Sequence, residues 1–228
     1  MSVNLKVLAG VGLLAIAPAS FAQNYSMDLT SVGNGTVADG VYVSPYVGTI
    51  SGPGMSYAGF VICDDFNSEA YLNTPWIATM SNAGALNGTQ KFGAAPGSTT
   101  SFGGSSYTIQ QAYNAAGWLA NGLLANLSNT NAQTNYAFAI WNIFDGQSTD
   151  PNGGAQALET AAFAAASSGT NAYVAGNVSV FTPSAVNPTQ EFLVVHAAPE
   201  VDPTVAASGI SLLLGGVLVL RGRRKLGA

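Results

Sequence analysis

The chain has 228 residues, of which 48% are hydrophobic and only 7% carry a charge. That length and apolar content are enough for one domain with a substantial core, and they exclude a disordered chain. Of the six basic residues only Lys91 lies between residues 23 and 198, and one base against nine acids gives this segment a net charge of −8. Such a segment repels phosphate backbones, which excludes nucleic acid as a partner.

Residues 1–22 have the form of a secretory signal peptide. Lys6 precedes the apolar run 7–17, and the segment ends in the small-x-small pattern formed by Ser20 and Ala22. An apolar run of this length with these flanks is read by the Sec translocon and signal peptidase. We therefore predict export, with cleavage after Ala22, which leaves Gln23 as the first residue.

The first part of the exported segment, residues 25–79, has the character of β-strands. Three stretches rich in β-branched and aromatic residues are separated by turn sequences with Gly, Pro and Asn: residues 41–50, 57–66 and 74–80. Residues 81–106 are rich in Gly, Ser, Thr and Asn and have little periodicity. We expect a long loop or an irregular strand pair there.

The middle of the segment has the periodicity of helices. From Thr108 the apolar residues recur every three or four positions, and Thr108 and Gln111 have the spacing of a capping box. Thr130 and Gln133 repeat that spacing, and Gly146 is a stop signal for the second helix. An Ala-rich third helix is expected at residues 155–166.

Residues 171–181 and 191–197 return to strand character. The order of strands, helices and strands favours an α+β domain over a layer of parallel βαβ units. We predict an antiparallel β-sheet or barrel with a central block of about three helices over residues 23–197, with a membrane-signal helix at each end of the chain.

Cys63 is the single cysteine, so an intrachain disulfide is excluded. Asp64 and Asp65 follow it, and their charges disfavour a thiolate. This pattern favours a buried strand residue over a reactive thiol. A catalytic pair of Cys63 with His196, the single histidine, is the alternative.

Asp64, Asp65 and Glu69 form the densest acidic cluster and are the candidate ligands for a metal such as calcium. Their spacing is not that of an EF-hand, so we favour a solvated turn and predict no metal and no other cofactor. The chain also lacks a phosphate-binding Gly loop, a Gly-x-Ser-x-Gly elbow and a His-Glu-x-x-His motif. We therefore predict that it is not an enzyme.

The C-terminal part has the features of a membrane segment. The apolar run 205–220 would form a helix of about 24 Å, a little short of a bilayer core. Four bases follow it directly: Arg221, Arg223, Arg224 and Lys225. By the positive-inside rule, they form a cytoplasmic tail and the preceding chain lies outside.

Pro199 and Glu200 precede that run, and the order of a Pro-Glu pair, a Gly-containing apolar helix and a basic end resembles the PEP-CTERM sorting signal of Gram-negative bacteria. Here Val201 takes the third position and the second proline is displaced to Pro203. The resemblance covers residues 198–228. It implies recognition and cleavage by exosortase near Pro199 and Glu200, after transient residence in the inner membrane. It also implies display at the cell surface or in an extracellular biofilm matrix, in the company of exopolysaccharide.

The stretches VICDDF, AYNAAGWLANGL and YAFAIWNIFDG are similar in order to thioester-type surface adhesion domains. In that family a Cys in an early strand faces a Gln in an x-Gln-x-Ala-Ile-Trp helix. Alignment on Ala139 to Trp141 places Ala137 at the position of that Gln, and Gln110 is a substitute in another helix.

A noncatalytic, exosortase-sorted surface or matrix protein is our first hypothesis. One alternative is an adhesin with a reactive, thioester-like Cys63. Another is an ice-binding protein, because similar tails occur on such proteins. The last is a glycan-acting enzyme that would use the carboxylates Asp64, Asp65, Glu69, Asp145 and Asp150.

Overall fold

A computed structural model gives the structure of residues 23–93, 98–146, 150, 153–168, 176–185 and 189–196. The predicted signal peptide 1–22 and the predicted sorting signal 198–228 lie outside these described residues. The predictions for Ala22, Pro199, Glu200 and the four C-terminal bases therefore stay predictions. Among the described residues no helix combines the length and the hydropathy that a membrane crossing needs.

The described strands form a closed barrel in the order β1-β4-β5-β10-β9-β6, and every neighbouring pair is antiparallel. The barrel strands are β1 (Asn24–Ser31), β4 (Tyr46–Gly52), β5 (Met55–Cys63), β6 (Trp76–Asn82), β9 (Val178–Pro183) and β10 (Phe192–Val195). Two small sheets accompany it, β2 (Val37–Ala38) with β3 (Val41–Tyr42) and β7 (Thr99–Phe102) with β8 (Ser105–Thr108). The predicted antiparallel barrel is confirmed.

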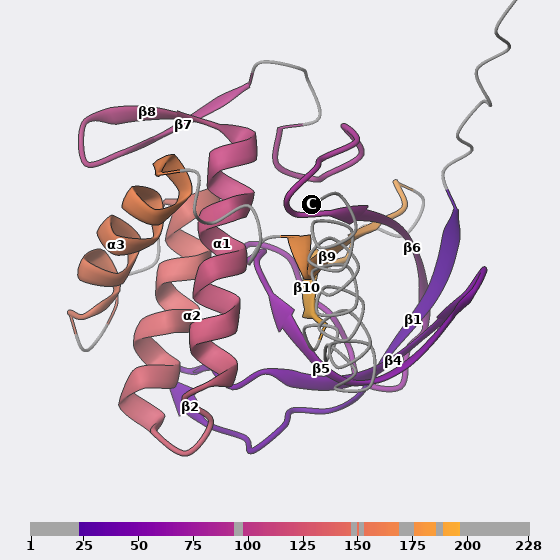
Figure 1. Cartoon of the computed structure of the whole chain (residues 1–228). Helices are drawn as coiled ribbons and strands as arrows, with labels where there is room; N and C mark the ends of the chain where they lie inside the picture. Colours follow the sequence, from indigo (N-terminus) through magenta and orange to yellow (C-terminus); the bar gives the residue numbers. More distant parts are fainter. Residues whose placement is uncertain are drawn as a thin grey trace, which may run out of the picture.

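Helices α1 (Ile109–Leu124), α2 (Thr130–Asp145) and α3 (Ala155–Ser167) pack against one another beside the barrel (Figure 1). Together with the barrel strands they make a mixed α+β fold. The three helices that the sequence predicts are confirmed within the described residues, and α3 ends one residue later than expected.

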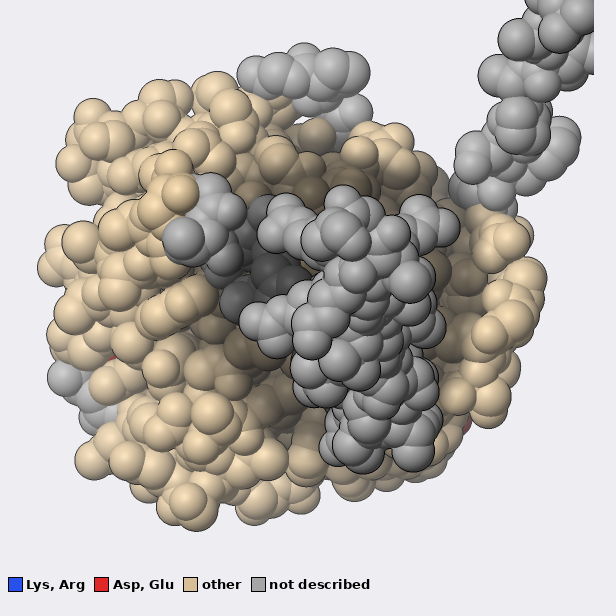
Figure 2. Space-filling view, viewed as in Figure 1, with Lys and Arg blue, Asp and Glu red and all other residues tan. Residues whose placement is uncertain are grey.

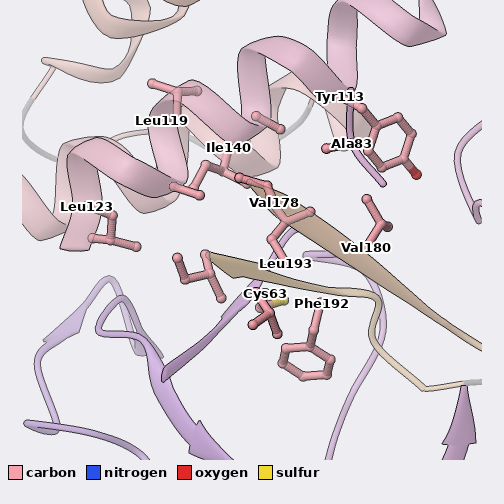
Figure 3. Packing of buried hydrophobic residues seen from close by; sticks show 14 of the residues in the cluster. Cys63, Ala83, Tyr113, Leu119, Leu123, Ile140, Val178, Val180, Phe192 and Leu193 are labelled. Atoms are coloured by element: carbon pink, nitrogen blue, oxygen red, sulfur yellow. The ribbon is translucent and has the colours of Figure 1, made fainter. Parts of the chain in front are cut away.

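One side of the barrel is covered by the helices. Strands β9 and β10 are buried over nearly their whole length, so both of their faces have apolar neighbours. Figure 3 shows Leu119 and Ile140 of the helices on the side of these strands that carries Val178 and Leu193. Phe192 points to the other side, where it packs against the ring of Trp76 inside the barrel.

The helix starts show where local sequence signals hold and where they fail. The capping box of Thr108 and Gln111 is present in full at the start of α1. The predicted box of Thr130 and Gln133 is wrong, because the cap of α2 is Asn129, whose side chain accepts a hydrogen bond from the Ala132 N–H. Asn is at least as good a cap as Thr, and its position one residue earlier takes that role.

Several predicted strands are shorter in the structure. Residues 41–50 are divided between β3 and β4, because Pro45 cannot donate a ladder hydrogen bond. The segment 57–66 leaves the sheet after Cys63, and the segment 74–80 enters it at Trp76. The segments 171–181 and 191–197 contribute only β9 and β10. The irregular strand pair expected within 81–106 is β7 and β8, which extends to Thr108.

Replacement of the α1 cap, Thr108→Ala, should lower the free energy of unfolding by about 1 kcal/mol, because the Gln111 N–H loses its acceptor. Thr130→Ala is the matched control, since Thr130 is an exposed threonine at a helix start whose side chain is not the cap. Urea denaturation followed by circular dichroism measures both variants. Equal losses in the two would contradict this assignment.

Candidate functional site

The candidate site lies at the end of the barrel where β5 meets the start of β10. Cys63 is paired with Phe192 in the ladder, and the Asp64 N–H donates to the carbonyl of Glu191 at 3.3 Å. Two segments far apart in the sequence therefore bring their acidic residues together. Asp64, Asp65 and Glu191 are all fully buried.

Glu191 is the best-bonded of these acids. Its Oε1 accepts a hydrogen bond from the hydroxyl of Tyr113, and its Oε2 accepts from the hydroxyl of Thr182 and from the Lys91 backbone N–H, the last at 2.8 Å. Burial raises the pKa of Glu191, while these hydrogen bonds act in the opposite direction. The donors favour a charged carboxylate at Glu191.

Asp64 has the opposite surroundings. No other described residue donates a hydrogen bond to either of its oxygens, and the group that Asp64 faces is the carboxylate of Glu191, which is another acceptor. Burial, and next the charge of Glu191, raise the pKa of Asp64 well above its ordinary range. Two acceptors can bond to each other only through a proton. The contact between the two carboxyl groups therefore requires a shared proton, and the direction of the pKa shift places this proton on Asp64, as the donor to Glu191.

Asp65 is neutralised by an ion pair. Its carboxylate contacts the ammonium group of Lys91, which also contacts the hydroxyl of Ser68. Lys91 is the single base between residues 23 and 198, and its ammonium group forms an ion pair with this buried acid. The predicted solvated turn is therefore wrong for Asp64 and Asp65, because residues distant in sequence supply the partners that make their burial tolerable.

A cavity of about 420 Å³ opens beside these acids. Its lining comes from β3 and the residue before it, from the start of β4, from the end of β5 and the loop after it, from α2 and from the segment before β10. The lining residues are Gly40, Val41, Tyr42, Tyr46, Cys63, Phe66, Ser68, Glu69, Ala70, Tyr71, Trp141 and Gln190.

Cys63 is buried, as the sequence predicts, although it lines this cavity. Its thiol donates to the Asp65 carbonyl at 3.2 Å, and its own carbonyl accepts a hydrogen bond from the Trp141 indole N–H at 3.0 Å. Burial raises the pKa of the Cys63 thiol well above its ordinary value. The protonated thiol is the favoured form, and the reactivity of Cys63 stays a prediction.

His196 does not join Cys63. It hydrogen bonds with Ser179 at 2.8 Å, and its ring packs against Tyr57. Since Phe192 is the ladder partner of Cys63, His196 lies four residues further along, roughly 13 Å at about 3.3 Å per residue. The structure therefore does not support the alternative of a Cys-His pair.

The other candidate carboxylates are engaged in backbone capping or exposed. Asp145 accepts from the Phe66 N–H and from Asn67, and Asp150 accepts from the Ala155 N–H at the start of α3. Glu69 is exposed, as expected of a solvated turn. The described parts of the chain contain no group of three His, Cys, Asp or Glu side chains arranged to hold a metal ion.

The two glutamine positions that the thioester resemblance raises lie elsewhere. Ala137 is buried within α2, and Gln110 is bonded to Ala83 and Leu86. Neither lines the cavity of Cys63. Sequence analysis missed Gln190, which does line it, and whose amide donates to the Asp65 and Ser68 carbonyls. No motif marks Gln190, but Lys91, as a lone base among nine acids, was a recognisable candidate partner for a buried carboxylate.

Comparison with known proteins gives one structural likeness to report. No family model matches the chain, and no curated protein matches it. The N-terminal thioester domain of the fibronectin-binding protein SfbI from Streptococcus pyogenes is similar to it with a TM-score of 0.38 and 12% sequence identity. The match covers 80% of this chain and 97% of that domain.

The protonated Asp64 makes stability depend on pH. Its native pKa is raised above the unfolded value of about 3.9, so the native state binds more protons and loses stability as the pH rises from that value. In Asp64→Asn the amide replaces the shared proton as the donor to Glu191. From about pH 4 upward we expect the wild type to lose up to about 1.4 kcal/mol per pH unit more than this variant.

Denaturant titrations across that pH range measure the two slopes. Asp39→Asn, which removes an exposed charge, is the control and should keep the wild-type slope. If Asp64→Asn also keeps it, Asp64 is not protonated in the native state.

Proposed function

We propose that the chain is an exported, noncatalytic protein that exosortase sorts to the cell surface or the extracellular matrix, where it is associated with exopolysaccharide. The observation that carries the proposal is the pair of sequence signals, residues 1–22 and 198–228, at the two ends of the chain. All described strands and helices lie between Asn24 and Val195, and β1 begins two residues after the predicted cleavage site. The barrel thus occupies the span between the predicted signal peptide and the predicted sorting signal.

The surface chemistry also supports a place in a hydrated matrix. On the face shown in Figure 2, charged side chains are almost absent from the described residues. Amides and hydroxyls exchange hydrogen bonds between water and sugars at little cost in free energy. In this proposal, helix 205–220 holds the protein in the inner membrane until exosortase acts on it.

A noncatalytic role agrees with the state of the carboxylates. Glycoside hydrolysis ordinarily uses two carboxyl groups that flank the scissile bond. Among the described residues, Asp145 and Asp150 cap backbone N–H groups, and Asp64 is closed inside the fold. The described barrel strands close on themselves and present no flat, repeated threonine array, so they do not favour the ice-binding alternative.

Sorting can be tested in a Gram-negative host that has an exosortase. The wild type should lose its C-terminal segment, whereas Glu200→Gln should stay full length in the inner membrane because the protease no longer finds its Pro-Glu pair. Asp202→Asn, which neutralises the next acid along the chain, should be cut normally. Cell fractionation and mass spectrometry of the C-terminus give the result. A wild type that stays uncut would contradict sorting by exosortase.

A second candidate is an adhesin with a reactive Cys63, and one contact favours it. The Cys63 thiol and the Gln190 amide both donate to the Asp65 carbonyl, each at 3.2 Å. If the sulfur attacks the amide carbon of Gln190, an S–C bond forms, the C–N bond breaks, and the nitrogen leaves as ammonia with the thiol proton. Gln190, in place of Ala137 or Gln110, would then be the acyl donor.

Intact mass measures this bond directly. A thioester would lower the mass of the wild type by one ammonia molecule and would react with methylamine. Gln190→Ala should show its full calculated mass, and Gln133→Ala, which changes a buried glutamine outside the cavity, should keep the loss. An unmodified wild type with a free thiol removes this candidate.

A further inference from the structure

Exposed apolar side chains gather at the mouth of the cavity. Of the large apolar residues that are exposed in the described part of the chain, Tyr71 is the most exposed at 64%, and Tyr42 is 44% exposed. Both line the cavity. Val37, which is also exposed, is the ladder partner of Tyr42. A group of exposed apolar side chains around a hollow marks a binding surface.

The ring of Tyr71 is held in place although it is not buried. Its hydroxyl donates to the carboxylate of Glu69, and the Glu69 carbonyl in turn accepts from the Thr189 hydroxyl at 2.7 Å. An exposed ring adds little to the core, so these contacts do not serve the packing of the barrel. Their effect is to fix a flat apolar face toward solvent before any ligand arrives, which lowers the entropic cost of binding.

The polar groups of the cavity are mainly hydroxyls. No described residue hydrogen bonds with the hydroxyl of Tyr46, and burial raises its pKa to about 12, so it stays a neutral donor and acceptor. The Ser68 hydroxyl can also donate, because its contact with Lys91 uses only its oxygen. Phe66 and Trp141 supply further aromatic surface, with ring centroids 5.1 Å apart.

The charge of the lining limits the ligand. Glu69 is the single charged side chain among the described residues that line the cavity, and the ammonium group of Lys91 is taken by Asp65. Carboxylated or sulfated chains are therefore repelled. A single carboxylate is also too few for acid-base cleavage of a glycoside, which leaves binding without hydrolysis.

We propose that this cavity binds a segment of an uncharged polysaccharide, with a sugar ring stacked on Tyr71 or Tyr42. A sugar has apolar C–H faces, which the negative face of an aromatic ring attracts, and a rim of hydroxyls that matches Tyr46, Ser68 and Glu69. This inference deepens the proposed association with exopolysaccharide and rests on it for the biological source of the ligand.

The test uses the full chain in a detergent without a sugar headgroup, and affinity electrophoresis through gels that contain one polymer each. The neutral probes are a glucan, a galactan, a mannan and a polymer of N-acetylglucosamine, and alginate is the anionic probe. We expect retardation by at least one neutral polymer and none by alginate. Tyr71→Ala and Tyr42→Ala should each weaken binding about tenfold, which corresponds to about 1.4 kcal/mol.

Phe60→Ala is the matched control, because Phe60 is an exposed aromatic residue that does not line the cavity, and it should leave binding unchanged. Absence of binding to every neutral polymer would overturn the inference. Binding of reduced, carboxymethylated α-lactalbumin in place of the glycans, with loss in Tyr71→Ala, would also overturn it in favour of a polypeptide ligand. These outcomes are independent of the fractionation test, so a failed glycan site and a failed sorting proposal can be told apart.

Discussion

The hydrogen bonds to Glu191 are the interaction on which the rest of the structure depends. This carboxylate lies directly before β10, and its donors come from α1, from β9 and from the loop after β6. A buried charge without donors would cost several kcal/mol, so the four segments are stable only in the arrangement that brings these donors to one point. Apolar packing between the helices and the barrel is strong but non-directional. The hydrogen bonds to Glu191 are directional, so they fix how α1, β9 and the loop after β6 are placed around β10.

The predictions that hold are those with a local physical cause. The capping box of α1 involves residues three apart, and the αL residue Gly146 ends α2 as its lack of a side chain predicts. The prediction for the start of α2 was wrong for an equally local reason, because Asn129 and not Thr130 is the N-cap of this helix. The strands were predictable from stretches rich in β-branched and aromatic residues between turn sequences, whereas the order of the strands, with β10 inserted between β5 and β9, depends on contacts that no local pattern contains.

The candidate site could be predicted only in part for the same reason. Cys63 and Glu69 stand out in the sequence by residue type, and Trp141 stands out through the motif around it. The burial of Asp64 and Asp65 could not be predicted, because acidic residues are expected at the surface unless a partner is known. The partner of Asp65 is Lys91 and that of Asp64 is Glu191, and both are distant in the sequence. Tyr42 and Tyr71 could not be recognised as site residues from the sequence, because only the fold brings them to the same cavity.

The closure of the barrel by β10 has a consequence for the order of folding. Strand β10 is the last described strand in the sequence, and it supplies the pairing edge to both β5 and β9. In synthesis from the N-terminus β1, β4 and β5 appear first, and the free edges of β5 and β9 have no partner until residues 192–195 have been made. The same part of the chain carries Glu191, so closure of the barrel and burial of its acids occur together. The barrel therefore closes only when residues 191–195 are available, so this late segment completes the folding of the domain.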